Sequence, residues 1–242
     1  MPNFKITLSY LGTNFHGWQI QPEDRTVQGE LNIRLRKLFG CEIRTVGASR
    51  TDARVHAVGQ VASAVLPDKY EPEDLRHRLN DMLPDDIAIR KIEIVPDSFS
   101  ARHSAKGKRY EYRILFEKDP HLSSTTLWIK SKPDLKTLTK TENLFLGTHD
   151  FSAFTRLESL PENSLCNIFS AKWLEHCDGL IFSVSGDRFL HTMIRGIVGA
   201  SIDCARGRFT IENLKEMIDN GKRLYDYKVV EAKGLWLMEV FY

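Results

Sequence analysis

The feature that most constrains the fold is the order in which apolar patterns follow one another in residues 1–95. Residues that alternate between apolar and polar predict half-buried strands, and apolar residues spaced three and four apart predict amphipathic helices. The predicted elements are a strand at 4–10, a helix at 27–39, strands at 41–46 and 61–66, a helix at 72–82 and a strand at 87–95. This β-α-β-β-α-β order is that of the split βαβ, or ferredoxin-like, fold.

Residues 106–242 repeat this order with one additional helix, after a predicted linker at 96–104. The predicted elements are strands at 108–116 and 127–129, a helix at 133–146, paired strands at 167–175 and 180–185 that turn at Cys177-Asp178-Gly179, helices at 188–204 and 211–219, and a strand at 235–241. Functional sites commonly lie in clefts between such halves. We therefore expect an α+β protein with two ferredoxin-like (split βαβ) halves, 1–105 and 106–242, whose mostly antiparallel sheets meet at a central catalytic cleft.

The composition argues against several classes of protein. Hydrophobic residues make up 42% of the 242 residues and charged residues 27%, which is the balance of a folded protein rather than a disordered one. The cysteines form no CxxC pair and have no histidine at zinc-ligand spacing, so we expect no metal site and a reducing compartment. No GxxxxGK(S/T) or GxGxxG loop is present, so we expect no nucleotide cofactor. The sequence shows neither a signal peptide nor a membrane-spanning run, so we expect no membrane association and a cytoplasmic location.

The stretch 46–60, VGASRTDARVHAVGQ, concentrates charge among small residues. Its single carboxylate, Asp52, stands among Arg50, Arg54 and His56, and nearby positive charge favours the ionised form of a carboxyl group. Small residues permit tight turns and close approach of the backbone to a ligand. One hypothesis is that Asp52 is a nucleophile or base and that the rest of the chain builds a cleft around it. The alternative is a solvated turn with a local Arg–Asp pair.

A second concentration of positive charge occurs at 101–113, ARHSAKGKRYEYR. The formal net charge is only +2, so any binding to nucleic acid must depend on such local clusters. Lys106, Lys108 and Arg109 are suited to phosphate groups, and Tyr110 is suited to stacking on an unpaired base. Because Tyr110 shares a strand face with apolar residues, its ring should point inward. The alternative is an exposed strand edge that Lys and Arg keep soluble.

Two further side chains each have two interpretations. Arg195 lies in an otherwise apolar predicted helix, and a buried guanidinium requires an anionic partner, for which Asp187 and Asp52 are candidates. A purely structural role for Arg195 is the alternative. Trp18 lies in a predicted loop, where it is either part of a recognition surface or folded back onto the core.

These motifs resemble those of the bacterial tRNA pseudouridine synthase A family, and the resemblance covers nearly the whole chain. The family's opening pattern, Y.G..F.GWQ.Q, occurs at 10–21, and its catalytic signature, usually GRTDAGVHA.GQV, occurs as SRTDARVHAVGQV at 49–61. Further matching pieces are Thr26-Val27-Gln28, Leu83-Pro84 with Asp86-Ile87, Phe99 with Ala101-Arg102, Lys108-Arg109-Tyr110, Gly147 with His149-Asp150-Phe151, Phe189 through Met193 with Arg195 and Gly199, and Gly234-Leu235.

The resemblance implies a tRNA pseudouridine synthase that isomerises uridine to pseudouridine at positions 38–40 of the anticodon stem-loop. It also implies a homodimer that needs no metal, nucleotide or redox cofactor. By the same resemblance Asp52 is the nucleophile, attacking either C1′ or C6 of the target nucleotide, and Arg50, Tyr110 and Arg195 complete the catalytic set. The residues expected to bind the tRNA substrate are Tyr110, Arg54, Lys106, Lys108 and Arg109.

Two positions depart from the family pattern, because Ser49 and Arg54 stand where the family usually has glycine. If either position has a positive φ, a side chain there costs about 1 kcal/mol or more. The expected catalytic residues are all present, so we expect activity to be retained. Two other functions compete with this one: an RNA-binding or chaperone-like protein that has the fold without the chemistry, and an Asp-dependent hydrolase that acts on a nucleoside.

Overall fold

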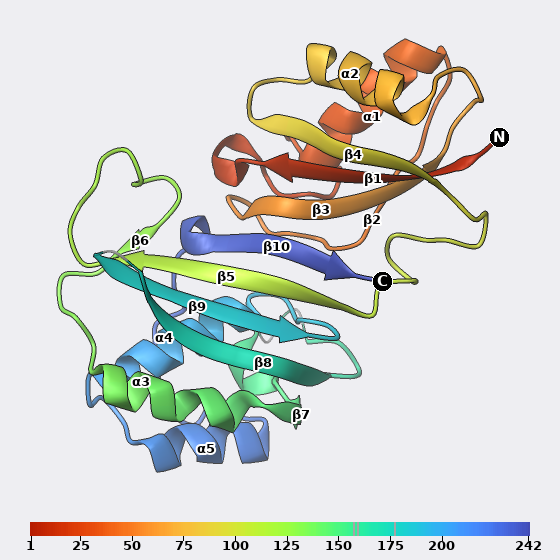
Figure 1. The fold of residues 1–242 in the computed structure, drawn as a ribbon. Coiled ribbons are helices and arrows are strands. Elements are labelled where there is room, and N and C mark those ends of the chain that lie inside the picture. Colours follow the sequence, from red (N-terminus) through yellow and green to blue (C-terminus); the bar gives the residue numbers. More distant parts are fainter. Residues whose placement is uncertain (157, 159, 177) are drawn as a thin grey trace. The chain divides into compact units, whose positions relative to one another are not determined.

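The computed structural model describes residues 1–156, 158, 160–176 and 178–242, which Figure 1 shows coloured along the sequence. The described chain divides into two compact units. Unit 1 comprises Met1–Lys106 and Trp236–Tyr242, and unit 2 comprises Gly107–Leu235. Cys177, which was expected in a turn between two strands, lies outside the described residues. Within the described ranges, no helix combines the length and the apolar character needed to cross a membrane.

Unit 1 contains a sheet with the strand order β4-β1-β3-β10. Strand β1 is antiparallel to both of its neighbours, β10 runs parallel to the start of β3, and β2 pairs with a later part of β3. The bounds are β1 (Asn3–Tyr10), α1 (Val27–Phe39), β2 (Val46–Gly47), β3 (His56–Val65), α2 (Pro72–Met82), β4 (Ile87–Val95) and β10 (Leu235–Phe241).

The sequence accounts for where α1 and α2 begin and end. The side chain of Thr26 accepts a hydrogen bond from the backbone N–H of Gly29, and Gly40 closes α1 in the left-handed conformation with a φ of 71°. Helix α2 starts with Pro72, whose fixed φ suits a first helical position. Both helices lie on the same side of the sheet in Figure 1. They face the buried, alternate residues of β1, which confirms the half-buried strand predicted at 4–10.

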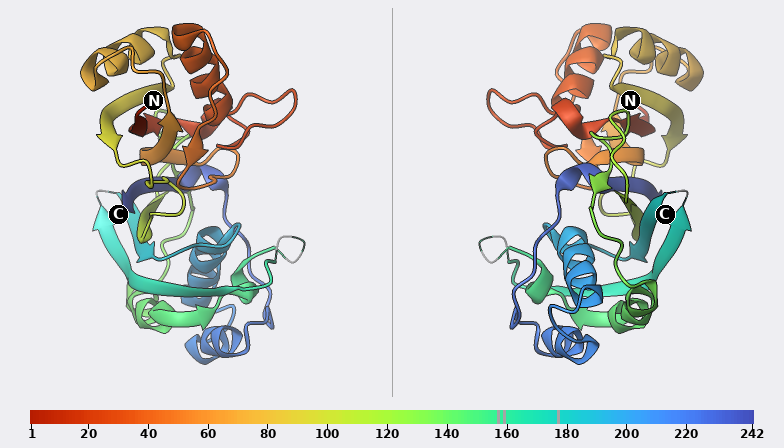
Figure 2. Two further views of the ribbon diagram at one scale, coloured as in Figure 1. Left: turned by 90° about the vertical axis from the view of Figure 1, so that its right-hand side faces the viewer. Right: turned by 90° about the vertical axis from the view of Figure 1, so that its left-hand side faces the viewer.

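Unit 2 contains a sheet with the strand order β5-β9-β8-β7, in which neighbouring strands are antiparallel, and the short β6 runs parallel to the end of β5. Helices α3, α4 and α5 pack against one another, and α3 lies along β8 (Figure 2). The bounds are β5 (Gly107–Leu115), β6 (Leu127–Trp128), α3 (Leu135–Glu142), β7 (Gly147–Asp150), β8 (Leu165–His176), β9 (Gly179–Gly186), α4 (Met193–Ala205) and α5 (Ile211–Asn220).

Two predicted helices begin later than expected. The helix predicted at 188–204 starts at Met193, because the preceding residue, Thr192, has a φ of 62° and cannot continue a right-handed helix. The helix predicted at 133–146 starts at Leu135 and ends at Glu142 as an α-helix, after which the chain tightens into a 3₁₀ turn. Apolar spacing alone does not report such turns, because a 3₁₀ turn buries similar residues.

Two strand boundaries also differ, and one strand was missed. Only Val46–Gly47 pairs in the stretch predicted as a strand at 41–46. Strand β3 begins at His56 rather than at 61; the prediction missed its first five residues because Ala57, Gly59 and Gln60 give them no continuous apolar pattern. Strand β7, at Gly147–Asp150, was not predicted, because its four residues are neither apolar nor β-branched as a group.

The end of the chain belongs to unit 1. The predicted division assigned all of 106–242 to the second half, whereas Trp236–Tyr242 packs with unit 1. Trp236 aligns in register with His56 at the start of β3, and the two rings stack with centroids 4.5 Å apart. The apolar pattern of a strand shows that it is half-buried but does not show which sheet it joins.

Candidate active site

Residues 49–55, which we call the Asp52 loop, connect β2 with β3 in unit 1. The backbone N–H of Val55 donates to the carbonyl of Asp52 at 3.2 Å, which closes a tight turn at the end of the loop. Asp52 is half-buried and Arg50 is exposed. The carboxylate is therefore carried on a turn, closed by a backbone hydrogen bond, that leads into β3.

Residues 11–25, which we call the Trp18 loop, hold the Asp52 loop by backbone hydrogen bonds. The N–H of Trp18 donates to the carbonyl of Thr51 at 3.1 Å, and the N–H of Arg54 donates to the carbonyl of Phe15 at 3.2 Å. The indole of Trp18 is only 1% exposed and covers Gly47, where an added Cβ would lie 2.3 Å from Nε1. Of the two interpretations of Trp18, the structure supports the one in which the ring folds back onto the core.

Two glycines of the Trp18 loop allow this close approach. A Cβ at Gly12 would lie 2.0 Å from the carbonyl oxygen of Val55, and a Cβ at Gly17 would lie 2.6 Å from that of Thr51. Gly17 also has a φ of 95°, which L side chains rarely adopt. The two loops therefore meet at a separation that only glycine permits.

His56 has a structural role rather than the cationic one suggested by its position in the sequence. Its ring is fully buried, stacks on Trp236 and accepts a hydrogen bond at Nδ1 from the backbone N–H of Gly12 at 3.0 Å. A nitrogen that accepts a hydrogen bond carries no proton, so the proton of a neutral His56 is on Nε2. His56 thus links the start of β3 to the Trp18 loop.

The two departures from the family pattern have different consequences. Arg54 has a φ of 66°, so a side chain is present in a conformation that glycine adopts without strain. Among the described residues, the others with a positive φ that are not glycine are Glu23 and Thr192, so Ser49 has ordinary backbone geometry. The condition for strain is therefore met at Arg54 and not at Ser49.

In unit 2, β5 carries Tyr110 on one face and Arg109 on the other, and Lys108 shares the face of Tyr110. Tyr110 is 5% exposed and meets the edge of Phe189 with ring centroids 5.3 Å apart, so its ring points inward as predicted. On the outward face, Glu111 accepts from Arg109 at 3.0 Å and from Arg113 at 3.3 Å. The outward face of β5 therefore contains a carboxylate between two guanidinium groups.

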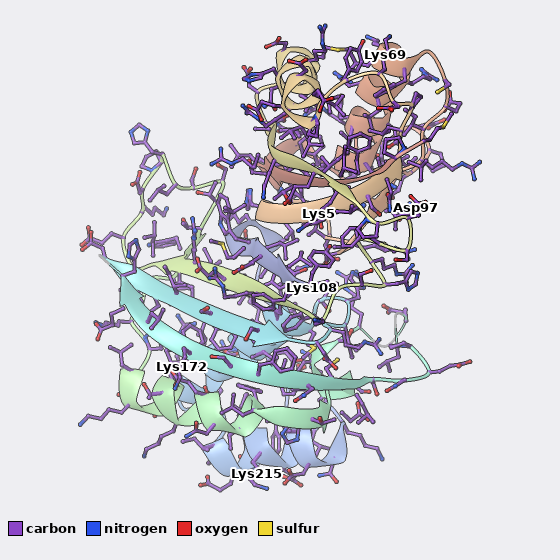
Figure 3. All side chains as sticks on the ribbon, turned by 45° about the vertical axis from the view of Figure 1, so that its right-hand side comes forward. Lys5, Lys69, Asp97, Lys108, Lys172 and Lys215 are labelled. Atoms are coloured by element: carbon purple, nitrogen blue, oxygen red, sulfur yellow. The ribbon has the colours of Figure 1, made fainter. Side chains whose placement is uncertain are left out.

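The two lysines near the start of β5 differ in their surroundings. Lys108 is half-buried on β5 in unit 2, where Figure 3 labels it. Lys106 is exposed and belongs to unit 1, where its backbone N–H donates to the carbonyl of Phe241 at 2.8 Å. The backbone of Lys106 is thus bonded to the last strand of unit 1, and its side chain is exposed.

Arg195 lies in the first turn of α4 and is half-buried, and its Nε donates to the carbonyl of Val230 at 2.8 Å. Asp187, one of the two suggested partners, has an oxygen that accepts backbone N–H groups at 2.9 Å and 2.6 Å, so it supports a turn next to β9. The neighbouring phenol of Tyr112 is fully buried, and burial raises its pKa far above the usual value, against the opposing effect of the Arg195 charge.

The predicted site residues divide between the units. Unit 1 contains Asp52, Arg50, Arg54 and Lys106, and unit 2 contains Tyr110, Arg195, Lys108 and Arg109. Three buried residues in or next to the Asp52 loop were given no role from the sequence: Tyr10, Thr51 and Gln60. The available signal was Gln60, a polar residue inside a strand that is otherwise apolar or small. Among the described residues, no cluster of three or more His, Cys, Asp or Glu side chains could hold a metal ion.

Comparisons with known proteins agree with the sequence motifs. A family model described as tRNA pseudouridine synthase matches residues 6–104 and 143–242. Proteins named tRNA pseudouridine synthase A from Acetivibrio thermocellus and Dictyoglomus thermophilum are 38% and 39% identical, each with full coverage of both chains. The protein of that name from Methylacidiphilum infernorum is 38% identical over 99% of this chain and 95% of its own.

Solved structures are less similar. The archaeal box H/ACA sRNP Nop10-Cbf5 complex aligns over 81% of this chain and 42% of that chain, with 11% identity and a TM-score of 0.35, which is too low to support a structural argument. The family model covers most of the chain, and the relatives match it from end to end. The chain therefore belongs to the tRNA pseudouridine synthase family, a family of isomerases that act on tRNA.

Proposed function

We propose that the protein isomerises uridine to pseudouridine at positions 38–40 of the tRNA anticodon stem-loop, with Asp52 as the nucleophile. The observation that carries this proposal is the Asp52 loop: a half-buried carboxylate on a turn that backbone hydrogen bonds hold in place, in a chain of this family. A carboxylate nucleophile must be ionised and fixed in position. The turn provides the second of these conditions.

The reaction needs no co-reactant, because it is an isomerisation. An oxygen of Asp52 attacks C1′ or C6 of the target nucleotide, the C1′–N1 bond breaks, and the uracil turns. A bond then forms between C5 and C1′, the C5 proton leaves, and Asp52 is released. The hydroxyl oxygen of Tyr110 takes up that proton, directly or through a water molecule, while its own O–H proton passes to water, and its ring stacks on the extruded base.

The remaining site residues act on the geometry and charge of the bound RNA. Extruding the uridine costs a few kcal/mol of lost stacking, and the exposed Arg50 fills the space that the base vacates. The guanidinium of Arg195 favours the ionised form of Asp52. The residues that we expect to contact phosphate groups are Arg54, Lys106, Lys108 and Arg109.

We also propose a fold, an oligomeric state and a cellular location for the protein. The two halves of the chain are proposed to be ferredoxin-like and to meet at the catalytic cleft, with the C-terminal residues Trp236–Tyr242 added to the first half. Two copies of the chain form a homodimer that presents a composite basic surface to tRNA in the cytoplasm. The element order β1-α1-β2-β3-α2-β4 supports this proposal for the first half. Sedimentation equilibrium should give twice the mass of the 27.8 kDa chain, and a monomer mass would contradict the dimer.

The experiment that tests the function uses a tRNA transcript labelled with tritium at C5 of its uridines. A synthase releases that tritium to water, and Asp52→Ala should abolish the release while tRNA binding in a filter assay changes by less than about threefold. The matched control is Asp97→Ala, which removes an exposed carboxylate of unit 1 outside the Asp52 loop (Figure 3) and should leave the release unchanged.

Three outcomes would contradict the proposal. Continued tritium release by Asp52→Ala would remove Asp52 from the role of nucleophile. Free uracil without pseudouridine would show a hydrolase. Binding of tRNA by the unmodified protein with neither product would show an RNA-binding protein that has the fold without the chemistry.

A further inference from the structure

We propose that Tyr10, Thr51 and Gln60 form a buried network that positions Asp52 by fixing the backbone on both sides of Arg50. This inference rests on the proposed role of Asp52 as the nucleophile. The three side chains are 3%, 7% and 0% exposed, and their printed hydrogen bonds run to one another and to the backbone, so we assign them a positioning role rather than a catalytic one. They come from β1, the Asp52 loop and β3 of unit 1.

Gln60 replaces a missing piece of backbone pairing between β2 and β3. The strands align Val46 with Ser63 and Gly47 with Ala62, and this register would continue with Ala48 opposite Val61 and Ser49 opposite Gln60. The N–H of Ala48 still donates to the carbonyl of Val61 at 2.8 Å, and at Ser49 the side chain of Gln60 makes the contacts. Its Nε2 donates to the carbonyl of Ser49 at 2.8 Å, and its Oε1 accepts from the N–H of Ser49 at 3.3 Å.

This arrangement keeps the backbone of Ser49 hydrogen-bonded beyond the end of β2. Both backbone polar groups of Ser49 are paired with one side chain, as they would be with a neighbouring strand. The same Oε1 also accepts from the N–H of Val61 at 3.1 Å, which fixes the Gln60 side chain on its own strand. The first residue of the Asp52 loop is therefore held as firmly as a strand residue.

Tyr10 extends the network to the residue that precedes Asp52. Nε2 of Gln60 donates to the hydroxyl of Tyr10 at 3.4 Å, and the Tyr10 hydroxyl shares a hydrogen bond of 2.8 Å with Oγ1 of Thr51, in which either oxygen can be the donor. The carbonyl of Thr51 also accepts the N–H of Trp18. Side-chain and backbone contacts from two different elements thus hold the residue that leads directly into Asp52.

The physical reason for such a network is geometric. A carboxylate that must attack a carbon atom needs near-attack geometry, and a displacement of about 1 Å can lower a rate about 100-fold. Arg50 is exposed, so its own packing does not fix the shape of the loop. Buried hydrogen bonds contribute to that shape, and the removal of one partner weakens the network.

The test is a double-mutant cycle on the hydroxyl pair, using Tyr10→Phe, Thr51→Val and the double variant. Single-turnover tritium release with enzyme in excess measures the chemical step. Each single variant should lower that rate about 10- to 100-fold with tRNA affinity changed by less than about twofold. Because both substitutions remove the same bond, the double variant should be about as slow as the slower single variant.

Two further variants separate positioning from general damage to the fold. Thr51→Ser retains the hydroxyl and should recover most of the wild-type rate. Tyr242→Phe removes a phenol that donates to the carbonyl of Ala101 at 2.9 Å in the same unit, and it should have the wild-type rate. Circular dichroism and urea unfolding at the assay temperature will show that all variants are folded.

The outcomes distinguish the network from the function on which it rests. If Asp52→Ala abolishes release while Tyr10→Phe and Thr51→Val react at the wild-type rate, the network is wrong and the function stands. If the double variant is slowed by the product of the two single effects, the hydroxyls act independently and the network is also wrong. If Asp52→Ala still releases tritium, the proposed function fails first.

Discussion

The Asp52 loop of unit 1 and the outward face of β5 in unit 2 are both charged, but different forces hold them. Backbone hydrogen bonds and a buried polar network surround the Asp52 loop. On β5, Arg109, Glu111 and Arg113 interact at 3.0 and 3.3 Å with partly exposed side chains. Ion pairs of this kind contribute about 0–1 kcal/mol each. The conformation of the Asp52 loop therefore depends on precise hydrogen-bonded geometry, whereas the side chains on the outward face of β5 interact mainly through their charges.

The largest expected effect comes from a change of shape at the Trp18 loop. In Gly12→Ala the new Cβ would lie 2.0 Å from the carbonyl oxygen of Val55, so the two loops must separate. We expect a loss of about 1–3 kcal/mol in the free energy of unfolding and a decrease in kcat of at least about tenfold. Urea unfolding and single-turnover tritium release measure the two quantities.

The matched control is Gly40→Ala at the end of α1. Gly40 has a φ of 71°, but no atom lies within 4 Å of an added Cβ, so the substitution adds strain without a clash. It should cost about 1 kcal/mol of stability and leave kcat unchanged. A wild-type kcat in Gly12→Ala would mean that the close approach of the two loops does not matter for catalysis.

This contrast also separates what could be predicted from the sequence from what could not. Local signals were sufficient for α1, whose predicted bounds are those of the structure, because Thr26 caps its start and Gly40 ends it. Local signals did not predict the start of α4, because Thr192 adopts a positive φ that its residue type does not indicate. The position of Asp52 between the second and third strands was predicted correctly, because the order of apolar patterns determines it.

The apolar pattern of the sequence did not predict the long-range contacts. Gln60 has an unusual type for its strand, but its partners are 11 and 50 residues away in the sequence. The parallel pairing of β10 with β3 joins residues about 180 positions apart in the sequence, and the covering of Gly47 by Trp18 joins the Trp18 loop to β2. Each of these contacts forms only in the completed fold, so the periodicity and spacing of residues do not predict them.

A smaller effect is expected from removing charge on β5. Lys108→Ala and Arg109→Ala should each weaken tRNA binding and reduce the slope of log affinity against log salt by about one. A variant with one phosphate contact fewer releases fewer counterions from the RNA when it binds. Stability should change by less than about 1 kcal/mol. Filter binding at several salt concentrations measures the slope.

Lys215 provides the control for these charge changes. It lies on α5, paired with Asp219, and Figure 3 shows it at the far edge of unit 2 from Lys108. Lys215→Ala removes the same charge and should leave the salt slope unchanged. Equal slopes for Lys108→Ala and Lys215→Ala would place the phosphate contacts elsewhere than on β5.

Arg54 lies on the loop but combines both properties, since it has a strained backbone and an exposed charge. Arg54→Gly should raise the free energy of unfolding by up to about 1 kcal/mol, because glycine adopts a positive φ without strain. The single-turnover rate should be unchanged, and the salt slope of tRNA binding should fall by about one if the guanidinium contacts a phosphate. A loss of stability would show that Arg54 makes compensating contacts.

The smallest effect concerns Tyr112, on the inward face of β5. Burial raises the pKa of its phenol, so the unfolded state loses this proton near pH 10 while the folded state retains it. Stability is therefore full below pH 10 and falls as the pH rises above it. The contribution of this one group amounts to about 0.7 kcal/mol between pH 9.5 and 10.5. Urea unfolding at both pH values should show a shallower decline for Tyr112→Phe, and an equal decline would assign the effect to other groups.

Residues Trp236–Tyr242 pack in unit 1 but are synthesised last, which affects how unit 1 folds during translation. A ribosome synthesises β1, β3 and the Asp52 loop early, but the strand that pairs with the start of β3 and stacks Trp236 on His56 is synthesised after all of unit 2. Contacts between residues so far apart in the sequence form slowly, because the intervening chain must be brought together first. The unit that holds Asp52 therefore cannot complete its sheet during most of translation. Nascent chains that stall before residue 236 should leave the edge of β3 open to chaperones and to pairing with other chains.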